Sequence, residues 1–504
     1  MERTGRSRWM AGLYALAVFA FVFVFFAQVH PLVLYDGDDW ANASYQRSAL
    51  PKWQGWNPSR VFPEVFMPLC TSLAAHVIYP LTGDYSGAVS LVFAVTAAAF
   101  ITAYACLLRR FAERRFLLDT PASILIAALF LALHFLCFRS LEYGNEHLFY
   151  AINACTFFNY TLPALLGACL VLLWEAGGCF ERFADPRHPV RDGLLILAVY
   201  MGIFSHLFGS QVLAIYAGVR IATDVCAQMA RTKKLSKAAC GMFTRHAWEW
   251  AVLLAWLIAL FFEVNGGRAG NLTADASLID NLKKVYWKLP SVRWKFNNLF
   301  LTISGAVPAA AAVVLLISKG RTEADRAFAQ SAVRSVLCLV LSAVYLVLLC
   351  AATKPSYIQS AQVLLGAVFY LLLLLSASAA YLVRKYPRLL AALPLALVLI
   401  VFETDTRQQT FAESNISGIP ARTAKAVSDA MIAQMVELER SGQTGEEALR
   451  LYVPVGDAND NWPHPTYMLY NFTKTLRKHG ILEHEYHFGT IVPTEDFDAR
   501  YGIR

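Results

Sequence analysis

Three carboxylates stand close together near the start of the chain, at Asp36, Asp38 and Asp39, and Trp40 follows them directly. An apolar stretch, residues 10–29, precedes them, so the sequence places them just outside a membrane-spanning helix. Neighbouring carboxylates repel one another, and burying them without partners costs free energy. The cluster is therefore either a solvated loop or a set of groups held at the membrane surface, where a carboxylate serves as catalytic base or metal ligand.

Aromatic and basic residues follow in the same loop, at Arg47, Trp53, Trp56 and Arg60. Tryptophan rings stack on sugars, and guanidinium groups pair with phosphate. Arg60 is therefore a candidate ligand of a phosphate, and Trp40 and Trp56 are candidate contacts of a sugar or of an acceptor. The alternative is that the rings anchor the loop in the membrane interface and that Arg60 forms a structural salt bridge with the aspartates.

A second outer loop, expected after residue 138, adds the carboxylates Glu142 and Glu146 to the same face. Both are candidate acceptor contacts beside Asp38. They are equally suited to a solvated turn, because charged side chains are common in such loops. The sequence does not decide between these two interpretations.

Three further residues are candidate ligands of a donor phosphate. His206 lies at the outer end of an expected span, Lys354 lies in a short outer loop with Tyr357, and Lys288 lies in the basic outer loop 264–298. Tyr357 is a candidate sugar contact. Lys354 could instead extend to lipid headgroups, and the loop 264–298 could instead form an amphipathic helix on the membrane surface.

The last candidate contacts lie far along the chain, in residues 457–465. Asp460 and Trp462 have the chemistry that binds carbohydrate, through hydrogen bonds to hydroxyl groups and ring stacking. The same residue types also make an ordinary turn. We therefore expect either an acceptor-binding loop or a plain connection at this point.

The composition identifies the class of protein that must position these residues. Of 504 residues, 57% are hydrophobic and 16% are charged, whereas soluble domains have about 45–50% and about 25%. A soluble enzyme, a disordered chain and a fibrous protein are excluded. The net charge of +8 is scattered over loops and does not predict nucleic-acid binding. The ten cysteines form no CxxC pattern, so neither a disulfide framework nor a structural zinc site is predicted.

A membrane span needs about 20 mostly apolar residues, and eleven stretches come close to this requirement. They are residues 10–30, 85–108, 120–138, 161–174, 192–207, 209–228, 247–263, 299–318, 332–352, 361–383 and 389–403. A twelfth stretch, 62–81, is apolar but includes Pro63, Glu64, Pro68 and His76, and counting it as a span would turn the Arg and Lys clusters outward. We therefore expect it to lie along the outer interface, with the N-terminus inside and the C-terminus outside.

The polar residues 404–504 form a separate unit after this membrane region of residues 1–403. The pattern predicts a helix from Pro420 to about Arg440, a strand over 449–455, a second helix over 466–479 and a second strand over 485–492. The chain is thus predicted to be an α-helical polytopic membrane protein. It has about eleven transmembrane helices, outer juxtamembrane helices in the first outer loop (31–84), and a small C-terminal α/β extracytoplasmic domain.

This arrangement resembles the GT-C membrane glycosyltransferases, and in particular the bacterial serotype-converting O-antigen glucosyltransferases. The match at residue level is confined to residues 36–63. It consists of Asp38, Asp39 and Trp40, followed by Arg47, Trp53 and Arg60. The many-span core and the polar outer C-terminal segment resemble the family only in general architecture, and the C-terminal unit is longer than in its simplest members.

The resemblance implies transfer of a single sugar, such as glucose, from a polyprenyl-phosphate donor to a glycan, with inversion, on the outer face of the bacterial inner membrane. Asp38 would be the general base, Asp39 would orient it or the acceptor, and Arg60 with Lys354 or Lys288 would neutralise the phosphate. Asp36 completes the acidic cluster. A divalent metal, Mg²⁺ or Mn²⁺, is allowed on these aspartates but not required. The implied partners are the lipid-linked sugar, the acceptor glycan, the bilayer, and a cognate polyprenyl-phosphate sugar synthase and flippase.

Two other functions stay open at this point. A flippase for lipid-linked sugars would need charged residues inside the spans, and only His134, Glu249 and Glu263 stand out there. A polysaccharide polymerase or ligase would use a longer lipid-linked donor, for which the basic loop 264–298 offers a pyrophosphate site.

Overall fold

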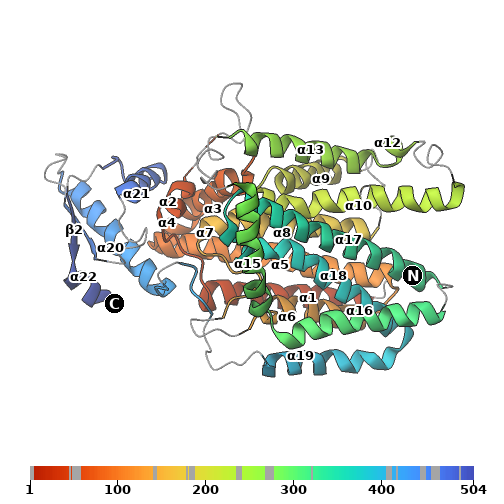
Figure 1. Cartoon of the computed structure of the whole chain (residues 1–504). Coiled ribbons are helices and arrows are strands. Elements are labelled where there is room, and N and C mark those ends of the chain that lie inside the picture. The colour runs from red at the N-terminus through yellow and green to blue at the C-terminus, as the bar shows by residue number, and fades with distance from the viewer. Residues whose placement is uncertain are drawn as a thin grey trace.

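The structure is a computed structural model, and it shows a long bundle of helices with a small unit attached at one end (Figure 1). It describes residues 5–44, 47, 58–139, 145–177, 180, 188–233, 241–266, 277–318, 322–403, 411–415, 418–442, 450–455, 466–486 and 490–503. We call the end of the bundle that carries the small unit the proximal end, and the opposite end the distal end.

Long apolar helices run back and forth between these two ends, because each one buries an apolar surface against its neighbours. The bundle elements are α1 (Gly5–Val24) with η1 (Phe25–Val29), α5 (Tyr85–Arg115), α6 (Thr120–Leu136), α7 (Ala154–Thr156) with η4 (Phe157–Thr161) and α8 (Leu162–Glu175), α9 (Pro189–Ile203), α10 (Leu207–Thr232), α12 (Met242–Arg245), α13 (Ala247–Val264), α16 (Asn298–Ser318), α17 (Glu323–Ala352), α18 (Ala361–Lys385), and η6 (Pro387–Ala391) with α19 (Ala392–Glu403). Helix α18 is almost entirely buried, so it forms the centre of the bundle.

Within the described residues, nine helices are long and apolar enough to cross a membrane, which supports the membrane-protein class. Eight of the eleven expected spans are among them. The three others are the shorter helices α6, α9 and α19, of 17, 15 and 12 residues. All three nevertheless pack beside other bundle helices, α6 against α5, α9 against α8 and α19 against α6.

The ninth long helix is the stretch that the sequence placed along the membrane surface. It consists of η2 (Phe62–Phe66), α3 (Met67–Leu73), η3 (Ala74–Ile78) and α4 (Tyr79–Thr82). It packs antiparallel to the first half of α5. Phe66 contacts Phe100 in the middle of α5, and Tyr79 contacts Tyr85 at its start. The helix thus accompanies α5 only at the proximal end, and it is embedded in the bundle more deeply than expected.

Two shorter elements cross the proximal end. Helix α15 (Leu278–Lys295) runs across the bundle helices in Figure 1, and it lies against η5 (Pro355–Gln359), the connection between α17 and α18. Its aromatic residues Tyr286, Trp287 and Trp294 are exposed. An amphipathic helix of this kind is suited to a membrane interface.

The small unit, called the C-terminal unit below, comprises residues 418–442, 450–455, 466–486 and 490–503. Its elements are α20 (Ala421–Arg440), β1 (Arg450–Pro454), α21 (Thr466–Lys478), β2 (Thr490–Thr494) and α22 (Glu495–Tyr501). The two strands pair in parallel, with Arg450 opposite Thr490. Strand β2 occurs later in the chain than the expected 485–492, and α22 was not expected.

The C-terminal unit docks on α2 (Gly37–Ala43), the helix that contains the acidic cluster. The ring of Phe472 meets the ring of Trp40 edge-on, with centroids 4.0 Å apart, and the hydroxyl of Thr475 donates to the carbonyl of Trp40 at 2.8 Å. The docking surface thus joins residues separated by more than 400 positions in the chain.

A second contact area extends from this surface to α5. The hydroxyl of Tyr85 lies 2.8 Å from Nδ1 of His479, and Lys425 forms an ion pair with Asp84 at 2.9 Å. The C-terminal unit is therefore held by several independent contacts to the proximal end.

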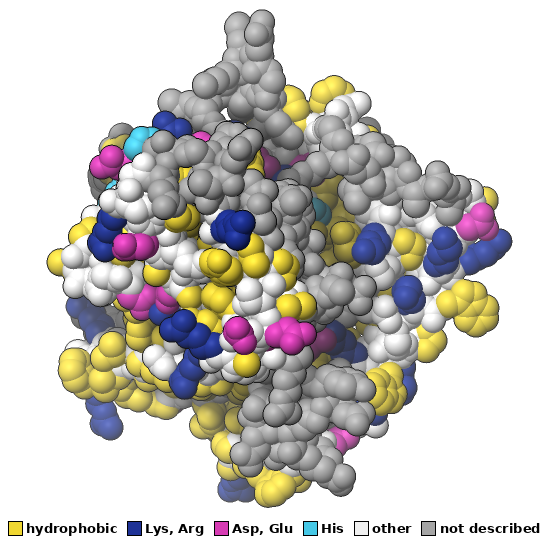
Figure 2. All heavy atoms as spheres, turned by 90° about the vertical axis from the view of Figure 1, so that its left-hand side faces the viewer, with side chains coloured by type: hydrophobic (Ala, Val, Ile, Leu, Met, Phe, Trp, Pro, Cys, Tyr) yellow, Lys and Arg dark blue, Asp and Glu magenta, His cyan; other side chains and the backbone are white. Residues whose placement is uncertain are grey.

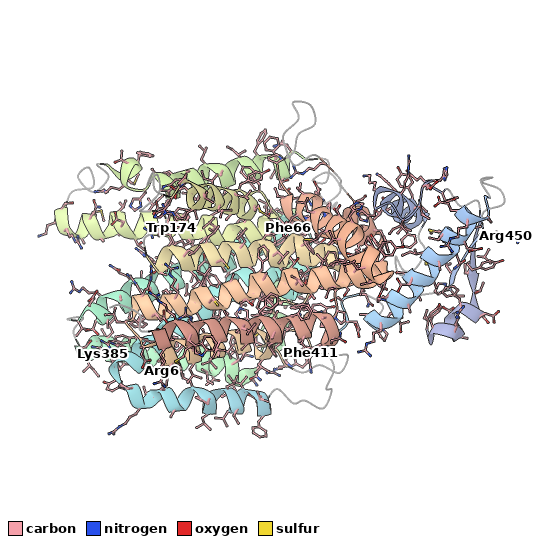
Figure 3. The ribbon with its side chains drawn as sticks, turned by 180° about the vertical axis from the view of Figure 1, so that it is seen from behind. Arg6, Phe66, Trp174, Lys385, Phe411 and Arg450 are labelled. Atoms are coloured by element: carbon pink, nitrogen blue, oxygen red, sulfur yellow. The ribbon has the colours of Figure 1, made fainter. Side chains whose placement is uncertain are left out.

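The two ends of the bundle differ in their charges. Figure 3 labels Arg6 and Lys385 at the distal end and Arg450 in the C-terminal unit at the other end. The arginines at the C-terminus of α5 and the basic residues that end α10 and α18 share the distal end with Arg6. If the distal end faces the cytoplasm, this distribution obeys the positive-inside rule.

Candidate active site at the proximal end

The acidic cluster forms the first turn of α2. Asp36 is the N-cap residue, and its Oδ1 accepts a hydrogen bond from the backbone N–H of Asp39 at 3.0 Å. In return, Oδ2 of Asp39 accepts from the N–H groups of Tyr35 at 2.8 Å and Asp36 at 3.4 Å. This is a capping box, which satisfies backbone donors that a helix start otherwise leaves unpaired. The helix begins at this point because two of the three carboxylates, those of Asp36 and Asp39, cap its N-terminus.

The same two carboxylates also join α2 to α7. Asn153, the N-cap of α7, donates from Nδ2 to Oδ2 of Asp36 at 2.7 Å, and the N–H of Cys155 donates to Oδ1 of Asp39 at 2.6 Å. Burial raises the pKa of Asp39, and the carboxyl of Asp36 raises it further, while three backbone N–H groups oppose the shift. Asp36 and Asp39 therefore hold two short helices together.

Asp38 differs from both neighbours, because it is exposed. Its backbone carbonyl accepts from Asn42, but its carboxylate accepts no hydrogen bond from any residue within the described ranges. The carboxylate nevertheless acts electrostatically on another proximal group. Burial raises the pKa of Tyr357 in η5, and the charge of Asp38 raises it further. Asp38 and Tyr357 are thus within electrostatic range of each other.

The segment before η2 supplies two arginines at the proximal end. Arg60 is buried, has a positive φ of 59°, and places Nη1 2.9 Å from Oε1 of Glu64. Arg47 reaches the other oxygen of Glu64 at 3.1 Å and donates to the carbonyls of Pro58 and Ser59. A left-handed conformation costs a non-glycine residue roughly 1–2 kcal/mol. Two ion pairs and two backbone contacts hold Arg60 in this strained position.

Arg60 and the acidic cluster lie close to each other. The thiol of Cys155 is within electrostatic reach of Arg60 and of all three aspartates. The N–H of Val61 donates to the carbonyl of Phe204 at 3.1 Å, which brings the turn between α9 and α10 to the same place. The structure therefore brings together Asp38, Arg60 and the region of His206.

Aromatic rings connect His206 to Tyr357. The ring of His206 lies 4.5 Å from that of Tyr160 and 5.2 Å from that of Phe208, and Phe208 lies 6.1 Å from Tyr357. The ammonium group of Lys354 lies over the ring of Tyr357, 5.7 Å from its centroid. This aromatic cluster, from His206 to Tyr357, lies beside the exposed ammonium group of Lys354. Flat rings bind sugars and a cation binds phosphate, so both suit a sugar phosphate.

Two other predicted site residues, Lys288 and Glu146, make contacts that fix α15 and η5, the element that contains Tyr357. Lys288 of α15 donates to the side chain of Gln359 at 3.3 Å, and Lys295 donates to the backbone carbonyl of Gln359 at 2.9 Å. Glu146 forms an ion pair with Lys295. Lys288 and Glu146 therefore hold α15 and η5 in place, and the structure does not bring Glu146 to Asp38.

Three further predictions need correction. Trp40 is completely buried between α2 and α21, so its ring has no open face for a sugar. Asp36 and Asp39 are buried, and both oxygens of each carboxylate already accept hydrogen bonds. Their hydrogen bonds position α2, which fits the alternative that Asp39 orients Asp38. The candidates Trp56, Glu142, Asp460 and Trp462 lie outside the described residues, as does Trp53.

The sequence interpretation missed Asn153, Cys155, Glu64 and Tyr160 as parts of this site. One signal was present. Asn153 is followed three positions later by Thr156 and then by an apolar run, which is a helix-start pattern. It would have marked the start of α7, but not its partner.

The arrangement offers little for a metal ion. Within the described part of the chain, no three His, Cys, Asp or Glu side chains come together as metal ligands. Asp36 and Asp39 are occupied by N–H donors, which leaves Asp38 as the open carboxylate of the cluster.

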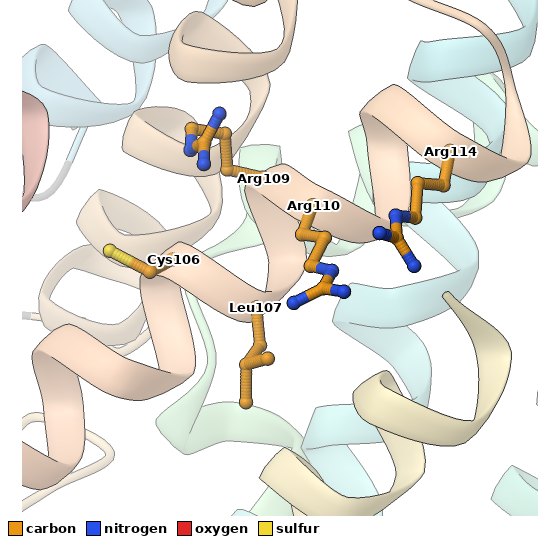
Figure 4. Close-up of a pocket in the computed structure, with 5 residues that line it drawn as sticks. All are labelled: Cys106, Leu107, Arg109, Arg110 and Arg114. Atoms are coloured by element: carbon orange, nitrogen blue, oxygen red, sulfur yellow. The ribbon is translucent and has the colours of Figure 1, made fainter. Parts of the chain in front are cut away.

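A separate hollow of about 440 Å³ lies near the distal end and has a different character. It is lined by the α5 residues Cys106, Leu107, Arg109, Arg110 and Arg114, whose side chains diverge in Figure 4. Arg109 pairs with Glu113 one turn along the same helix. This hollow lies at the opposite end of α5 from the proximal site, so it does not contribute to it.

A scan of the chain against protein-family models found no match, and a search among curated proteins found none either.

Proposed function

We propose that the chain is an integral membrane glycosyltransferase of the GT-C type. It moves one sugar, with a hexose such as glucose favoured, from a polyprenyl-phosphate donor to a glycan at the proximal end. Asp38 is the general base. The proximal end faces the outside of a bacterial inner membrane, and the distal end faces the cytoplasm.

One observation carries this proposal: of three adjacent carboxylates, two are consumed in capping and only Asp38 is open. A chain that needed charge only for solubility would have no reason to fix α2 so firmly at both Asp36 and Asp39. Rigid support behind one exposed group is the arrangement that catalysis requires.

The surrounding cations fit a phosphate leaving group. Lys354 lies over the ring of Tyr357, which is within electrostatic range of Asp38, and Arg60 is within electrostatic range of Cys155, as Asp38 is. A positive charge fixed near the leaving group stabilises the negative charge that develops on it in the transition state. The strained backbone of Arg60 supports a functional role, because such strain persists mainly where a site requires it.

The reaction then proceeds in a single displacement. Asp38 takes the proton of the attacking acceptor hydroxyl, and that oxygen forms a bond to the anomeric carbon. The bond between the anomeric carbon and the phosphate oxygen breaks on the opposite face, so the configuration inverts. The departing polyprenyl phosphate has a second pKa of about 6, so a carboxylate is a sufficient base.

The charged groups within the bundle favour this function over a flippase. The ring of His134 is hydrogen-bonded to the hydroxyl of Tyr104 at 3.2 Å and to the carbonyl of Phe130 at 2.8 Å. Glu249 pairs with Arg220 at 3.0 Å and with His246 at 3.2 Å. These partners give His134 and Glu249 a structural role in the bundle, so neither of the two needs a transported substrate to explain it.

The test compares the surface glycans of wild-type, deletion and Asp38→Asn strains by NMR. We expect both mutant strains to lack one side-branch sugar and to keep the polymer. Loss of the polymer itself, or a change in its length, would instead favour a polymerase, ligase or flippase. An effect of the deletion alone would remove Asp38 as the base.

A further inference from the structure

The C-terminal unit contains a groove on the surface formed by α20, β1 and α22. Its volume is about 1170 Å³. Three alanines spaced along one face of α20, Ala426, Ala430 and Ala433, form its floor. Small residues there leave room that larger side chains would fill. Figure 2 looks onto the C-terminal unit and shows acidic and basic side chains interspersed with apolar ones.

Aromatic rings form the wall of the groove. Tyr452 of β1 is 46% exposed although its backbone is fully paired, because Gln434 of α20 bonds both its N–H and its carbonyl at 2.9 Å. Phe497 and Tyr501 of α22 lie 5.0 Å apart, centroid to centroid. The rings are therefore held by ordered elements while they stay accessible.

The charged side chains of the groove are balanced in sign, and Arg500 lies over the ring of Tyr501, 5.5 Å from its centroid. Glu437 and Asp496 supply two negative charges, and Arg450 and Arg500 supply two positive charges. Within the described residues, none of these four forms an ion pair, whereas the fifth charged residue, Asp429, pairs with Lys425 at 3.0 Å. Both signs of charge therefore line the groove without an ion pair among these four side chains.

These features select the chemistry of the occupant. A polyanion or a polycation would meet two like charges in this groove. A neutral, hydroxyl-rich chain finds donors and acceptors of both kinds, together with flat rings for its sugar faces. Pockets for small molecules have volumes of about 300–1,000 Å³, so this groove has room for several sugar units.

We propose that this groove binds a neutral stretch of the acceptor glycan. The inference rests on the proposed function. Figure 1 places α22 and β2 on the side of the C-terminal unit away from the bundle, so α20 and α21 separate the groove from Asp38. The groove therefore holds a remote part of a long acceptor, and it does not touch the sugar that reacts.

The experiment measures binding without turnover. The probe is a set of size-fractionated neutral oligosaccharides cut by mild acid from the surface polysaccharide of the host. Saturation-transfer NMR with the detergent-solubilised full chain, in the absence of donor, reports binding. We expect Tyr452→Ala and Tyr501→Ala each to weaken binding at least about fivefold, since each removes a stacking face. The matched control is Tyr470→Ala, because Tyr470 has the same 46% exposure and lies in α21 outside the groove.

Wild-type chain that binds none of the fractions would overturn the groove proposal, as would equal weakening by Tyr452→Ala and Tyr470→Ala. The Asp38→Asn chain should bind the oligosaccharides as the wild type does. Binding that depends on Tyr452, combined with unchanged glycans in the Asp38→Asn strain, would keep the groove and remove the transferase. Normal transfer, combined with oligosaccharide binding that Tyr452→Ala does not weaken, would keep the transferase and remove the groove.

Discussion

The two ends of the bundle use charged residues in opposite ways. At the distal end, Glu175 is buried and accepts from Arg334 at 3.0 Å and from the hydroxyl of Tyr216 at 2.7 Å, with Arg115 at 3.9 Å. Figure 3 shows the neighbouring Trp174 toward that end. At the proximal end, Asp38 is exposed and its carboxylate has no such partners among the described residues.

The difference separates structural charges from chemical ones. A closed network, in which each charge neutralises another, fixes helices α5, α8, α10 and α17 to one another. An open carboxylate held on a rigid helix has the capacity to accept a proton from something outside the chain. The proximal end contains both kinds side by side, since Asp39 is closed and Asp38 is open. Substitutions that affect stability and activity separately test this distinction between paired structural charges and the open carboxylate.

The largest expected loss of stability follows Glu175→Gln. It leaves the partly buried Arg334 and Arg115 without their buried counter-charge, and breaking a fully buried pair costs about 3–5 kcal/mol, which sets the upper bound. Thermal unfolding in detergent measures the loss. The matched control is Glu323→Gln, an exposed carboxylate in the first turn of α17, whose effect should stay within about 0.5 kcal/mol. Equal melting temperatures for the two variants would show that the distal network is not structural.

Asp39→Asn should destabilise the protein by about 1–3 kcal/mol. An amide NH₂ in place of one oxygen would point a donor at the N–H of Tyr35 or of Cys155. Asp38→Asn changes an exposed group and should leave the unfolding temperature unchanged. If the two substitutions lower it equally, the distinction between the closed and the open carboxylate fails.

The attachment of the C-terminal unit should weaken in acid. Burial, together with smaller contributions from the nearby His76 and Lys478, lowers the pKa of His479 from its usual 6.5 to about 4. Below pH 6.5 the unfolded chain takes up the proton before the folded chain does, so stability is lost as the pH falls toward 4. At pH 5 the free energy of unfolding is lower by about 2 kcal/mol than at pH 7.5 through this one histidine.

His479→Gln should remove that share of the pH dependence. Burial also lowers the pKa of His30 to about 4, so some acid sensitivity stays in the variant. Unfolding curves at pH 7.5 and pH 5 measure both effects. Identical slopes for wild type and variant would show that His479 is not buried in the neutral form.

The smallest effect is expected for Thr475→Val. It removes the hydrogen bond to the carbonyl of Trp40 while keeping the volume, which should cost about 1 kcal/mol. Limited proteolysis of the C-terminal unit should become faster, and the melting temperature of the bundle should hold. Unchanged proteolysis would indicate that the ring contact of Phe472 suffices for docking.

The sequence predicts the membrane class well because long apolar runs leave few alternatives. Residues 62–81 are harder to judge, because the sequence places them outside the spans from the Arg and Lys clusters that an extra span would turn outward, and Glu64 lies within the stretch. In the structure Glu64 is neutralised by Arg47 and Arg60, which only the folded chain brings together. Charge counting along the chain has no access to such pairs.

The candidate site shows the same limit. Spacing alone marked Asp36, Asp38 and Asp39 as equivalent, because all three share one short segment. Their roles diverge through Asn153 and Cys155, which lie more than 110 positions away and donate to two of the three. Trp40 was assigned to a sugar for a similar reason, since its partner Phe472 lies in the C-terminal unit.

The most direct test of the central claim is a transfer assay with purified wild-type, Asp38→Asn and Asp39→Asn proteins, normalised to folded protein. The substrates are a polyprenyl-phosphate sugar and the surface glycan of the host. We predict that Asp38→Asn loses transfer at least about 100-fold with normal stability, as expected for removal of a general base. Asp39→Asn should lose stability first and keep more of its transfer. Transfer by Asp38→Asn within about threefold of wild type would contradict the account, because the open carboxylate would then not be the base.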